Sequence, residues 1–523
     1  MKAVGNLRPE SDIKLGKEVI TGIYWNKYGE KVLYLRFREQ KHYMSELKSK
    51  MERGLLWGGI NSGLTQVLNL VFGIVLARLL SPHDYGIVGV LVIFSTIAGN
   101  LQNCGFVNGL INLKSPSSRD YNSVFWFNIS VSFIIYIILF ISSPLISWYF
   151  KSDELLWLSR FVFLSFFVSS FGIAPSALLT KRLMVKEKAI AGFLGLSISG
   201  IAGVFLAFMG YGYWSLAWQG LVYITVVNAV RYYYTWRLWR PSLRIDFGPV
   251  KTMFPFSVNI LITNIAGTIN TNVLTFLFGR MFPMSSVGNY SQAQKWSFMG
   301  YSLISGTVEQ VAQPVLRETR ETGGEKGMFL GLVRLIAFFS FPLMFGLALV
   351  SEEFILVLLG EKWLSSAFML RILSIGGAFM PLYVMYQNLA ISKGRSDIYM
   401  KITLGQIIIQ GLIILGLHGL GMEKMVMSVT AFLVLWLGVW QRVAYKLSGI
   451  RFKDVLRGIM PYMLVSLAVM LLSGYITKGI SGAVWILLSR IALSVVLYIL
   501  AIRLICPEIM RESLRALKIK RRK

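Results

Sequence analysis

Long apolar segments recur along the whole chain, and they constrain its fold more than any other feature. Fourteen windows are apolar enough over about 20 residues to cross a bilayer as helices. The connections between them are short, and none is long enough to hold a soluble domain. We therefore expect an all-α polytopic membrane protein with fourteen transmembrane helices. The windows are residues 54–77, 85–113, 123–149, 155–179, 189–210, 213–231, 254–279, 287–314, 328–350, 363–391, 398–417, 425–444, 459–477 and 484–505.

The charge of the chain is strongly positive, with 53 Lys and Arg against 25 Asp and Glu and a net charge of +28. In a soluble protein this excess would suggest a nucleic-acid partner. Here 55% of the residues are hydrophobic, and the cations gather in the connections after even-numbered windows and in the tail 503–523. The positive-inside rule then places those connections and both termini in the cytoplasm, against anionic membrane lipids. We expect no nucleic-acid partner.

Residues 1–53 precede the first window and are the only sizeable segment outside the windows. They mix charges with short apolar patches and lack the apolar core and cleavage site of a signal peptide. The segment from Met44 leads directly into the first window, as a natural start would. We therefore expect residues 1–43 to be a mis-assigned start or a disordered tail. A small cytoplasmic cap is the alternative.

An internal repeat links the two halves of the chain. The segments after the first and seventh windows align at an offset of 202 residues, which superimposes Arg78 on Arg280 and Gly86 on Gly288. The first and seventh windows run in the same direction, so the repeat is parallel, and parallel repeats place a substrate site between the halves. We expect two parallel six-helix lobes, 54–251 and 252–446, around a central cavity. Residues 447–523 then supply two further helices and a basic cytoplasmic tail.

Four short stretches together resemble one protein family. They are LARLLSPHDYG at 76–86, GNYSQAQKW at 288–296, LGEKW at 359–363 with RIL at 371–373, and KGRSD at 393–397. From about Met44 to the C-terminus the chain is similar to polysaccharide transporters of the Wzx flippase type, most of all to their WzxC-like lipopolysaccharide branch. The resemblance implies the fold of the multidrug/oligosaccharidyl-lipid/polysaccharide exporter superfamily.

The resemblance also implies a function. Such proteins flip undecaprenyl-diphosphate-linked oligosaccharide across the bacterial inner membrane by alternating access, for lipopolysaccharide or exopolysaccharide (including O-antigen) biosynthesis. The expected partners are that lipid-linked glycan and, beyond it, the polysaccharide polymerase and chain-length machinery, with the flippase itself a monomer. No cofactor is expected except a coupling ion, H⁺ or Na⁺.

Charged side chains inside the windows are the candidates for the transport site, because a charge at bilayer depth costs about 2.5–3.5 kcal/mol on the most lenient scale. Most are cations, which suits a diphosphate. In window 287–314, Ser302 and Glu309 lie within about 40° of Lys295 at roughly 100° per residue, so they form one stripe with Gln292. The predicted substrate-binding residues are Lys295, Arg371, Gln292, Ser302, Arg160 and Arg334.

Three further residues receive other roles. Glu309 is the acid well inside a window, and we expect it to carry a coupling proton or to pair with Lys295 in one conformation. Arg78 and Arg280, at equivalent window ends, are candidates for a gate. Each assignment has a simpler alternative: cations that snorkel to the headgroups, interfacial anchors, or capping of helix carbonyls.

Other functions are less consistent with the sequence. A peptidoglycan lipid-precursor flippase or a drug/cation antiporter would share the fold, and the antiporter would depend most on Glu309. A membrane O-antigen polymerase or ligase is the enzyme alternative, but it would need a large periplasmic loop. The chain has no G-x-x-x-x-G-K-[ST] motif for nucleotide binding, and its Cys and His residues form no metal-ligand spacing. We expect a transporter with no catalytic residue and no metal site.

Overall fold

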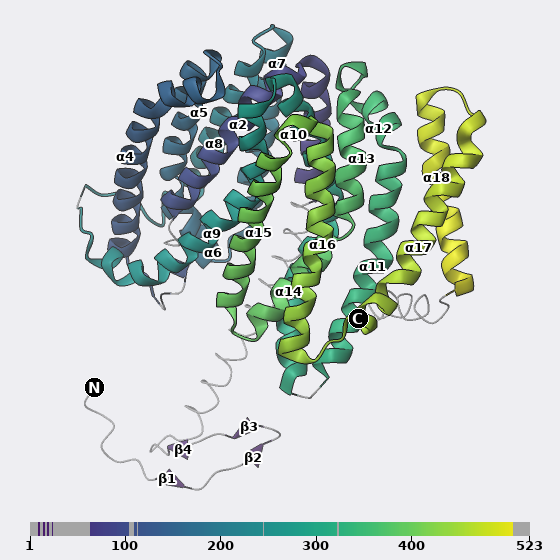
Figure 1. The fold of residues 1–523 in the computed structure, drawn as a ribbon. Helices are drawn as coiled ribbons and strands as arrows, with labels where there is room; N and C mark the ends of the chain where they lie inside the picture. Colours follow the sequence, from purple (N-terminus) through teal and green to yellow (C-terminus); the bar gives the residue numbers. More distant parts are fainter. Residues whose placement is uncertain are drawn as a thin grey trace.

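The computed structural model describes residues 63–103, 109–111, 113, 115–243, 245–321 and 324–505, together with four two-residue strands near the N-terminus (Figure 1). Strand β1 (Pro9–Glu10) pairs antiparallel with β4 (Ile23–Tyr24), and β2 (Lys14–Leu15) pairs antiparallel with β3 (Glu18–Val19). Apart from these strands, the expectations for residues 1–43 and for most of the basic tail concern segments outside the described residues.

The described core of the chain is helical, and each apolar window coincides with one helix or with two consecutive helices. The first half contains a helix at Gly63–Leu79, α2 (Pro82–Asn103), α4 (Ser118–Phe150), α5 (Glu154–Ser170), α6 (Ile173–Lys181), α7 (Val185–Phe208) and α8 (Tyr213–Thr235). The second half contains α9 (Gly248–Met281), α10 (Met284–Glu321), α11 (Glu325–Leu349), α12 (Ser351–Leu358), α13 (Ser365–Gly377), α14 (Met380–Ser392), α15 (Ser396–Gly416) and α16 (Met422–Ser448). Helices α17 (Phe452–Ile476) and α18 (Ala483–Ile505) follow, and single 3₁₀ turns lie at Glu361–Trp363, His418–Leu420 and Thr477–Gly479.

Nine of the described helices are long and apolar enough to cross a membrane, or ten if the bent pair α5 and α6 forms one span. The windows that fall short are 54–77, 213–231, 254–279 and 287–314, which correspond to the first described helix, α8, α9 and α10. Helix Gly63–Leu79 has only 17 described residues, whereas the other three carry many polar or aromatic side chains. The polytopic helical fold is therefore confirmed, and the number of fourteen spans stays a prediction.

Capping residues in the connections before α2 and α4 define where these two helices begin. Before α2, the Ser81 hydroxyl accepts a hydrogen bond from the Asp84 backbone N–H at 3.2 Å, and the Asp84 carboxylate accepts one from the Ser81 backbone N–H at 2.8 Å. Before α4, Ser117 and Asp120 form the same reciprocal capping box. These bonds satisfy backbone donors that have no partner within the helix. They fix the helix starts after the 63–79 helix and after the cationic connection near residue 115.

Helices α2 and α10 cross at the centre of the molecule, with α4, α5, α7 and α8 on one side and α11 to α13 on the other (Figure 1). A methyl group added at Gly86 would overlap the carbonyl oxygen of Met284, and one added at Gly288 would overlap that of Pro82. Residues 82 and 284, like 86 and 288, are related by the offset of 202. The crossing is thus self-complementary and supports a parallel repeat.

A large buried cluster surrounds this crossing and joins the two halves. It includes Leu91 of α2, Phe150 of α4, Phe278 of α9 and Tyr290 of α10. Trp363 is fully buried there, and its indole N–H donates a hydrogen bond to the backbone oxygen of residue 77 at 2.8 Å. Such packing between aromatic side chains stabilises one arrangement of the halves. This packing holds the two halves together around the crossing.

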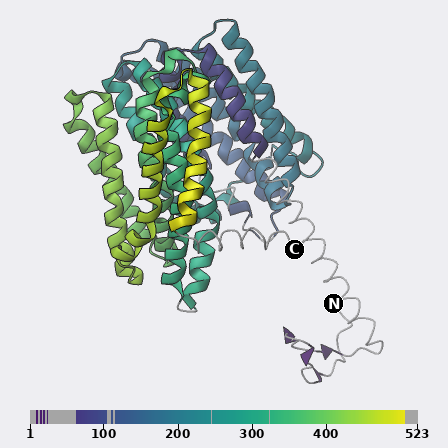
Figure 2. The same cartoon turned by 90° about the vertical axis from the view of Figure 1, so that its right-hand side faces the viewer.

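Helices α17 and α18 lie side by side outside this bundle (Figure 2). Helix α17 packs against α11, and α18 is attached by a buried ion pair in which Arg490 Nη1 lies 2.7 Å from Glu353 Oε1 of α12. Arg490 also donates to the hydroxyl of Thr477 at 3.1 Å. This arrangement gives Arg490 a structural role in holding α18.

Candidate functional site

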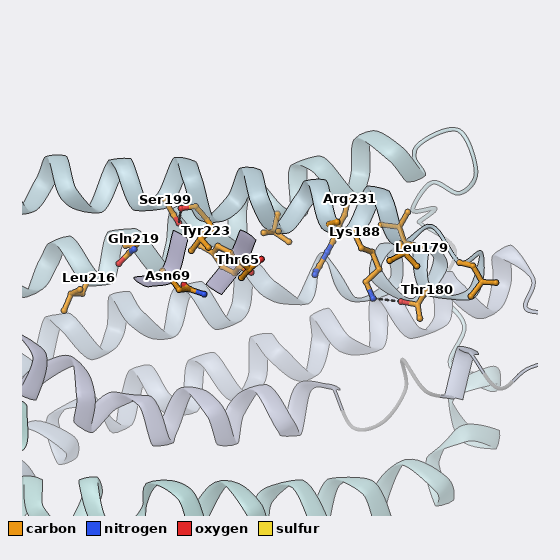
Figure 3. A pocket seen from close by; sticks show the side chains of 17 residues that line it. Thr65, Asn69, Leu179, Thr180, Lys188, Ser199, Leu216, Gln219, Tyr223 and Arg231 are labelled. Carbon is orange, nitrogen blue, oxygen red and sulfur yellow. Dashed lines mark hydrogen bonds between the residues drawn. The ribbon is translucent and has the colours of Figure 1, made fainter. Parts of the chain in front are cut away.

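Each half of the molecule contains a cavity lined by polar side chains. The first, here the amino-terminal cavity, lies between helix 63–79, α6, α7 and α8 and has a volume of about 690 Å³ (Figure 3). Its lining combines apolar side chains with two cations, Lys188 and Arg231. The lining residues are Thr65, Asn69, Leu179, Thr180, Leu183, Val185, Lys188, Ala189, Gly192, Leu196, Ser199, Leu216, Gln219, Gly220, Tyr223, Val227 and Arg231.

The two cations come from facing helix ends, because Lys188 lies in the first turn of α7 and Arg231 near the end of α8. The Lys188 ammonium donates a hydrogen bond to the Thr180 hydroxyl at 2.8 Å, as Figure 3 shows. The Arg231 side chain points toward the same region. No acidic side chain is among the described residues that line this cavity. Two cationic side chains thus line one cavity whose described lining contains no acidic side chain.

The Arg231 guanidinium rests against the bend between α5 and α6. A methyl group added at Gly172 would lie 3.1 Å from Arg231 Nη1 and would overlap the Asn228 side-chain oxygen. Asn228 in turn donates to the backbone oxygen of Val168 at 2.8 Å, which fixes α8 against α5. Arg231 Nε is buried and has no hydrogen-bond partner. A buried guanidinium N–H without a partner is costly, and guanidinium and ammonium groups bind anions through charge-assisted hydrogen bonds.

The second, carboxy-terminal cavity lies between α9, α10, α13, α14, α15 and α16 and has a volume of about 520 Å³. Its polar lining consists of amides and hydroxyls, and Glu309 is the single charged side chain among the described residues of that lining. The lining residues are Asn270, Thr271, Leu274, Tyr290, Gln294, Ser297, Phe298, Tyr301, Ser302, Ser305, Gly306, Glu309, Leu373, Gly376, Gly377, Met380, Tyr383, Val384, Gln387, Gln406, Gln410, Thr430 and Leu433.

The residues predicted on α10 divide between this cavity and the centre of the molecule. Ser302 and Glu309 line the carboxy-terminal cavity. Gln292 is 1% exposed, in the part of α10 that packs on α2. Lys295 points toward helix 63–79, where a methyl group added at Gly73 would lie 3.0 Å from its Nζ.

The helical geometry explains this division. The cavity-facing arc of α10 is centred near Phe298 and Ser305, which lie about 60–80° around the helix from Lys295. The stripe predicted from the sequence, which is centred on Lys295, therefore lies at the edge of the face of α10 that lines the cavity. A contact of Lys295 with substrate stays a prediction, in which its ammonium would act between the halves.

The other predicted cations lie outside the two cavity linings. Arg371 of α13 donates to the Ser351 hydroxyl at 3.3 Å and lies 3.9 Å from the Glu352 carboxylate. Arg334 is exposed on α11, close to Gly458 of α17. Binding of substrate by either residue stays a prediction.

Arg160 of α5 is held by side chains of α4 and of its own helix. Its Nε donates to the Ser143 hydroxyl at 2.8 Å, and its guanidinium lies over the rings of Phe140 and Trp157 at 4.4 and 4.7 Å from their centroids. A hydrogen bond and two cation–π contacts account for this cation without a ligand.

The two gate candidates make equivalent contacts across the halves. Arg78 donates to the backbone oxygens of Leu358 at 2.8 Å and Val357 at 2.5 Å, at the end of α12. Arg280 donates to the backbone oxygen of Tyr149, at the end of α4, at 2.8 Å. Each arginine therefore caps the end of a helix in the other half, where the helix dipole favours a cation. These contacts are the helix caps that the simpler alternative expects, and a role of the same contacts in a gate stays a prediction.

Sequence reasoning missed Lys188 and Arg231 because both lie at the ends of apolar windows. There they count among the connection cations that set orientation. One sequence signal could have found them. A short connection makes α7 and α8 an antiparallel pair, so the start of α7 with Lys188 and the end of α8 with Arg231 lie at the same level. Among the described residues, no group of three His, Cys, Asp or Glu side chains is arranged to hold a metal ion.

Comparisons with known proteins agree with this architecture. Residues 75–368 match the family described as polysaccharide biosynthesis protein. The teichuronic acid biosynthesis protein TuaB of Bacillus subtilis is 24% identical over 71% of this chain and 77% of its own length. The lipopolysaccharide biosynthesis protein WzxC of Escherichia coli is 25% identical over 68% of this chain and 72% of its own length.

Among solved structures, the lipid II flippase MurJ in an inward closed conformation superimposes with a TM-score of 0.69 at 15% identity. The superposition covers 87% of this chain and all of that one. At this identity the likeness establishes the fold. It is the fold of a multi-pass membrane protein, as the apolar helices also indicate.

Proposed function

Because the chain belongs to the polysaccharide biosynthesis protein family, we propose that it flips undecaprenyl-diphosphate-linked oligosaccharide across the bacterial inner membrane. The oligosaccharide would serve lipopolysaccharide or exopolysaccharide biosynthesis. The protein would act as a monomer with fourteen spans and both termini in the cytoplasm. It would deliver its product to the polysaccharide polymerase and chain-length machinery.

The observation that carries the proposal is the charge of the amino-terminal cavity. Lys188 and Arg231 share this cavity with no acid in its described lining, and Arg231 Nε is buried without a partner. A diphosphate offers several anionic oxygens, which ammonium and guanidinium donors bind with charge-assisted hydrogen bonds. A lipid-linked diphosphate therefore fits this cavity, and its sugars extend beyond it.

The closed crossing supplies the gate for alternating access. The pair Gly86 and Gly288 brings α2 and α10 into backbone contact, and Arg78 and Arg280 cap helix ends across the halves. In the proposed topology these residues face the periplasm. The described conformation would then receive its substrate from the cytoplasm, and rocking of the lobes would separate the crossing.

Glu309 is proposed as the coupling residue, with H⁺ or Na⁺ as the ion. It lies exposed to the carboxy-terminal cavity and is the only acid in the described lining. A carboxylate in such a position can change its protonation or bind a cation when the lobes move. No other cofactor is required.

The alternatives have weaker support. A drug/cation antiporter would be expected to have an acidic cavity, whereas the amino-terminal cavity is cationic. A peptidoglycan lipid-precursor flippase would use the same diphosphate chemistry, so the glycan distinguishes it. A membrane polymerase or ligase would need a large loop, but the described connections between the apolar helices are short.

Complementation tests the proposal in cells. A strain that lacks its polysaccharide flippase but makes the cognate lipid-linked glycan should regain surface polysaccharide when it expresses this chain. The double variant Lys188→Gln/Arg231→Gln should reach the membrane at wild-type levels and fail to restore the polysaccharide. Lys186→Gln is the control, because Lys186 is exposed on α7 and is not in the cavity lining.

Two results would contradict the proposal. In one, wild-type protein leaves the glycan on the cytoplasmic side. In the other, the double variant restores polysaccharide as well as wild type does. Rescue of a lipid II flippase depletion would favour the peptidoglycan alternative. Drug resistance that depends on Glu309 would favour the antiporter.

A further inference from the structure

The carboxy-terminal cavity has the chemistry of a sugar site. Its described lining contains five amides and several hydroxyls, with no cation. Sugar hydroxyls both donate and accept hydrogen bonds, and a side-chain amide offers one group of each kind. Aromatic rings in the same lining, including those of Tyr301 and Phe298, provide flat surfaces for the apolar faces of sugar rings. The volume of about 520 Å³ is within the range of small-ligand pockets.

Two buried polar atoms in this lining have no partner. The Gln410 side-chain oxygen and the Ser305 hydroxyl are buried without a hydrogen bond, and Gln410 as a whole is 2% exposed. An unpartnered buried polar group is costly, and native structures contain few of them. They come from two elements, α15 and α10, on either side of one cavity. A ligand with neutral hydroxyl groups would satisfy both.

A neighbouring contact keeps the amides of this cavity in place. The Gln406 side-chain nitrogen donates to the Asn270 side-chain oxygen at 3.1 Å and so links α15 to α9. Gln406 lies one turn from Gln410 on the same face of α15. The amides of Gln406 and Asn270 are therefore positioned before any ligand enters, which lowers the entropy lost on binding.

The two cavities are counterparts in the repeat but differ in charge. Asn69 lines the amino-terminal cavity, and Thr271, at the offset of 202, lines the carboxy-terminal one. The first cavity contains two cations, and the second contains neutral hydrogen-bonding groups and one acid. A lipid-linked headgroup likewise has an anionic diphosphate and a hydroxyl-rich glycan.

We propose that the carboxy-terminal cavity binds sugar residues of the transported headgroup and selects which glycans are carried. Gln410, Gln406 and Ser305 would contact the hydroxyl groups directly. This inference rests on the proposed function, which supplies a glycan-bearing substrate. It assigns glycan selection to the half of the molecule that does not hold the diphosphate.

Binding measurements on the purified full-length protein test this division. The two probes are inorganic diphosphate and the glycan released by mild acid from the lipid-linked oligosaccharides of the bacterium that makes this protein. Titration calorimetry should detect both ligands with wild type. Gln410→Leu should weaken glycan binding about tenfold, as expected for one buried hydrogen bond, and leave diphosphate binding unchanged. Lys188→Gln/Arg231→Gln should do the reverse.

Two further variants guard against a trivial result. Ser305→Ala is a small change that should preserve the fold and also weaken glycan binding. Gln313→Leu alters an exposed amide on the same α10 outside the cavity lining and should change neither affinity.

The inference is overturned if wild type does not bind the glycan, if Gln410→Leu and Ser305→Ala both bind it normally, or if each variant weakens both ligands together. A failure of the proposed function would appear separately, as absent complementation by wild-type protein. Glycan binding without complementation would support the site and reject the transport proposal.

Discussion

The crossing of α2 and α10 leads to a sharp prediction for Gly86→Ala. The added methyl group would overlap the carbonyl oxygen of Met284, which is a backbone atom and cannot rotate away. Overpacking of this kind costs about 1–3 kcal/mol. Alanine also improves helix propensity by about 1 kcal/mol, but that gain is shared by every conformation in which α2 stays helical. Only the overlap therefore changes the balance between conformations.

The expected shift is in the population with the crossing closed. A difference of about 1–3 kcal/mol changes the ratio of closed to open forms by about 5–150-fold. Spin labels at Lys151 and Glu361, which are exposed on opposite halves, would report that ratio through the distance measured by pulsed electron paramagnetic resonance. The native thiols at Cys104 and Cys506 would first be replaced by serine. Gly86→Ala should broaden the distribution of distances between the two labels toward longer values.

Gly99→Ala is the matched control in the same helix. A methyl group there meets no atom within 4 Å, so this variant should keep the wild-type distance distribution. A Gly86→Ala protein with an unchanged distribution would refute the idea that backbone contact at the crossing sets the balance. A Gly99→Ala protein that opens as much as Gly86→Ala would refute it equally.

Three further predictions follow from the charged contacts. Arg78→Gln loses two hydrogen bonds to the end of α12, each worth about 0.5–1.5 kcal/mol or more. Because the halves should then separate more often, a cysteine introduced near the crossing should react faster with a thiol label. Unchanged labelling would exclude a gate role. Glu353→Gln leaves the partly buried Arg490 guanidinium without its counter-charge, so thermal unfolding in detergent should reveal a loss of up to about 3 kcal/mol. An unchanged Tm would mean that the pair contributes nothing. The backbone N–H of Gly248 and the Arg119 guanidinium hold the pKa of Asp246 below its usual value. Its contribution is therefore present above the unfolded pKa of about 3.9 and is lost as pH falls through the folded pKa. Asp246→Asn should remove that part of the acid dependence of unfolding, and identical pH curves would contradict the assignment.

The helices could be predicted from sequence because they depend on local patterns, whereas the two parallel six-helix lobes stay a prediction. Each apolar window needs only enough consecutive nonpolar residues, and the match of Gly86 with Gly288 needs only an alignment. The structure then adds a physical reason for that match, since any side chain at either position would overlap the opposite backbone. Polarity also explains why α9 and α10 fall short as membrane spans, because they line a cavity.

The candidate site was harder to predict because it depends on helix rotation and on distances between helices. Ser302 and Glu309 line a cavity, but Lys295, about two turns before Ser302 on the predicted stripe, points toward Gly73 of the first described helix. A rotation of about 60–80° separates the two outcomes, and hydropathy does not define it. Lys188 and Arg231 are at window ends, where a cation that enters a cavity has the same sequence pattern as one that contacts headgroups.

The proposed transport of a lipid-linked diphosphate depends on the amino-terminal cavity. The direct measurement is the transbilayer movement of undecaprenyl-diphosphate-linked oligosaccharide in vesicles that contain the purified protein. Hydrogen bonds to charged groups are worth about 1.5–3 kcal/mol each, so removing both cations should weaken headgroup binding by about 10²–10⁴-fold. We predict movement well above that in protein-free vesicles, lost in Lys188→Gln/Arg231→Gln and kept in Lys186→Gln. Movement no faster than in empty vesicles, or equal movement in the double variant, would contradict the account.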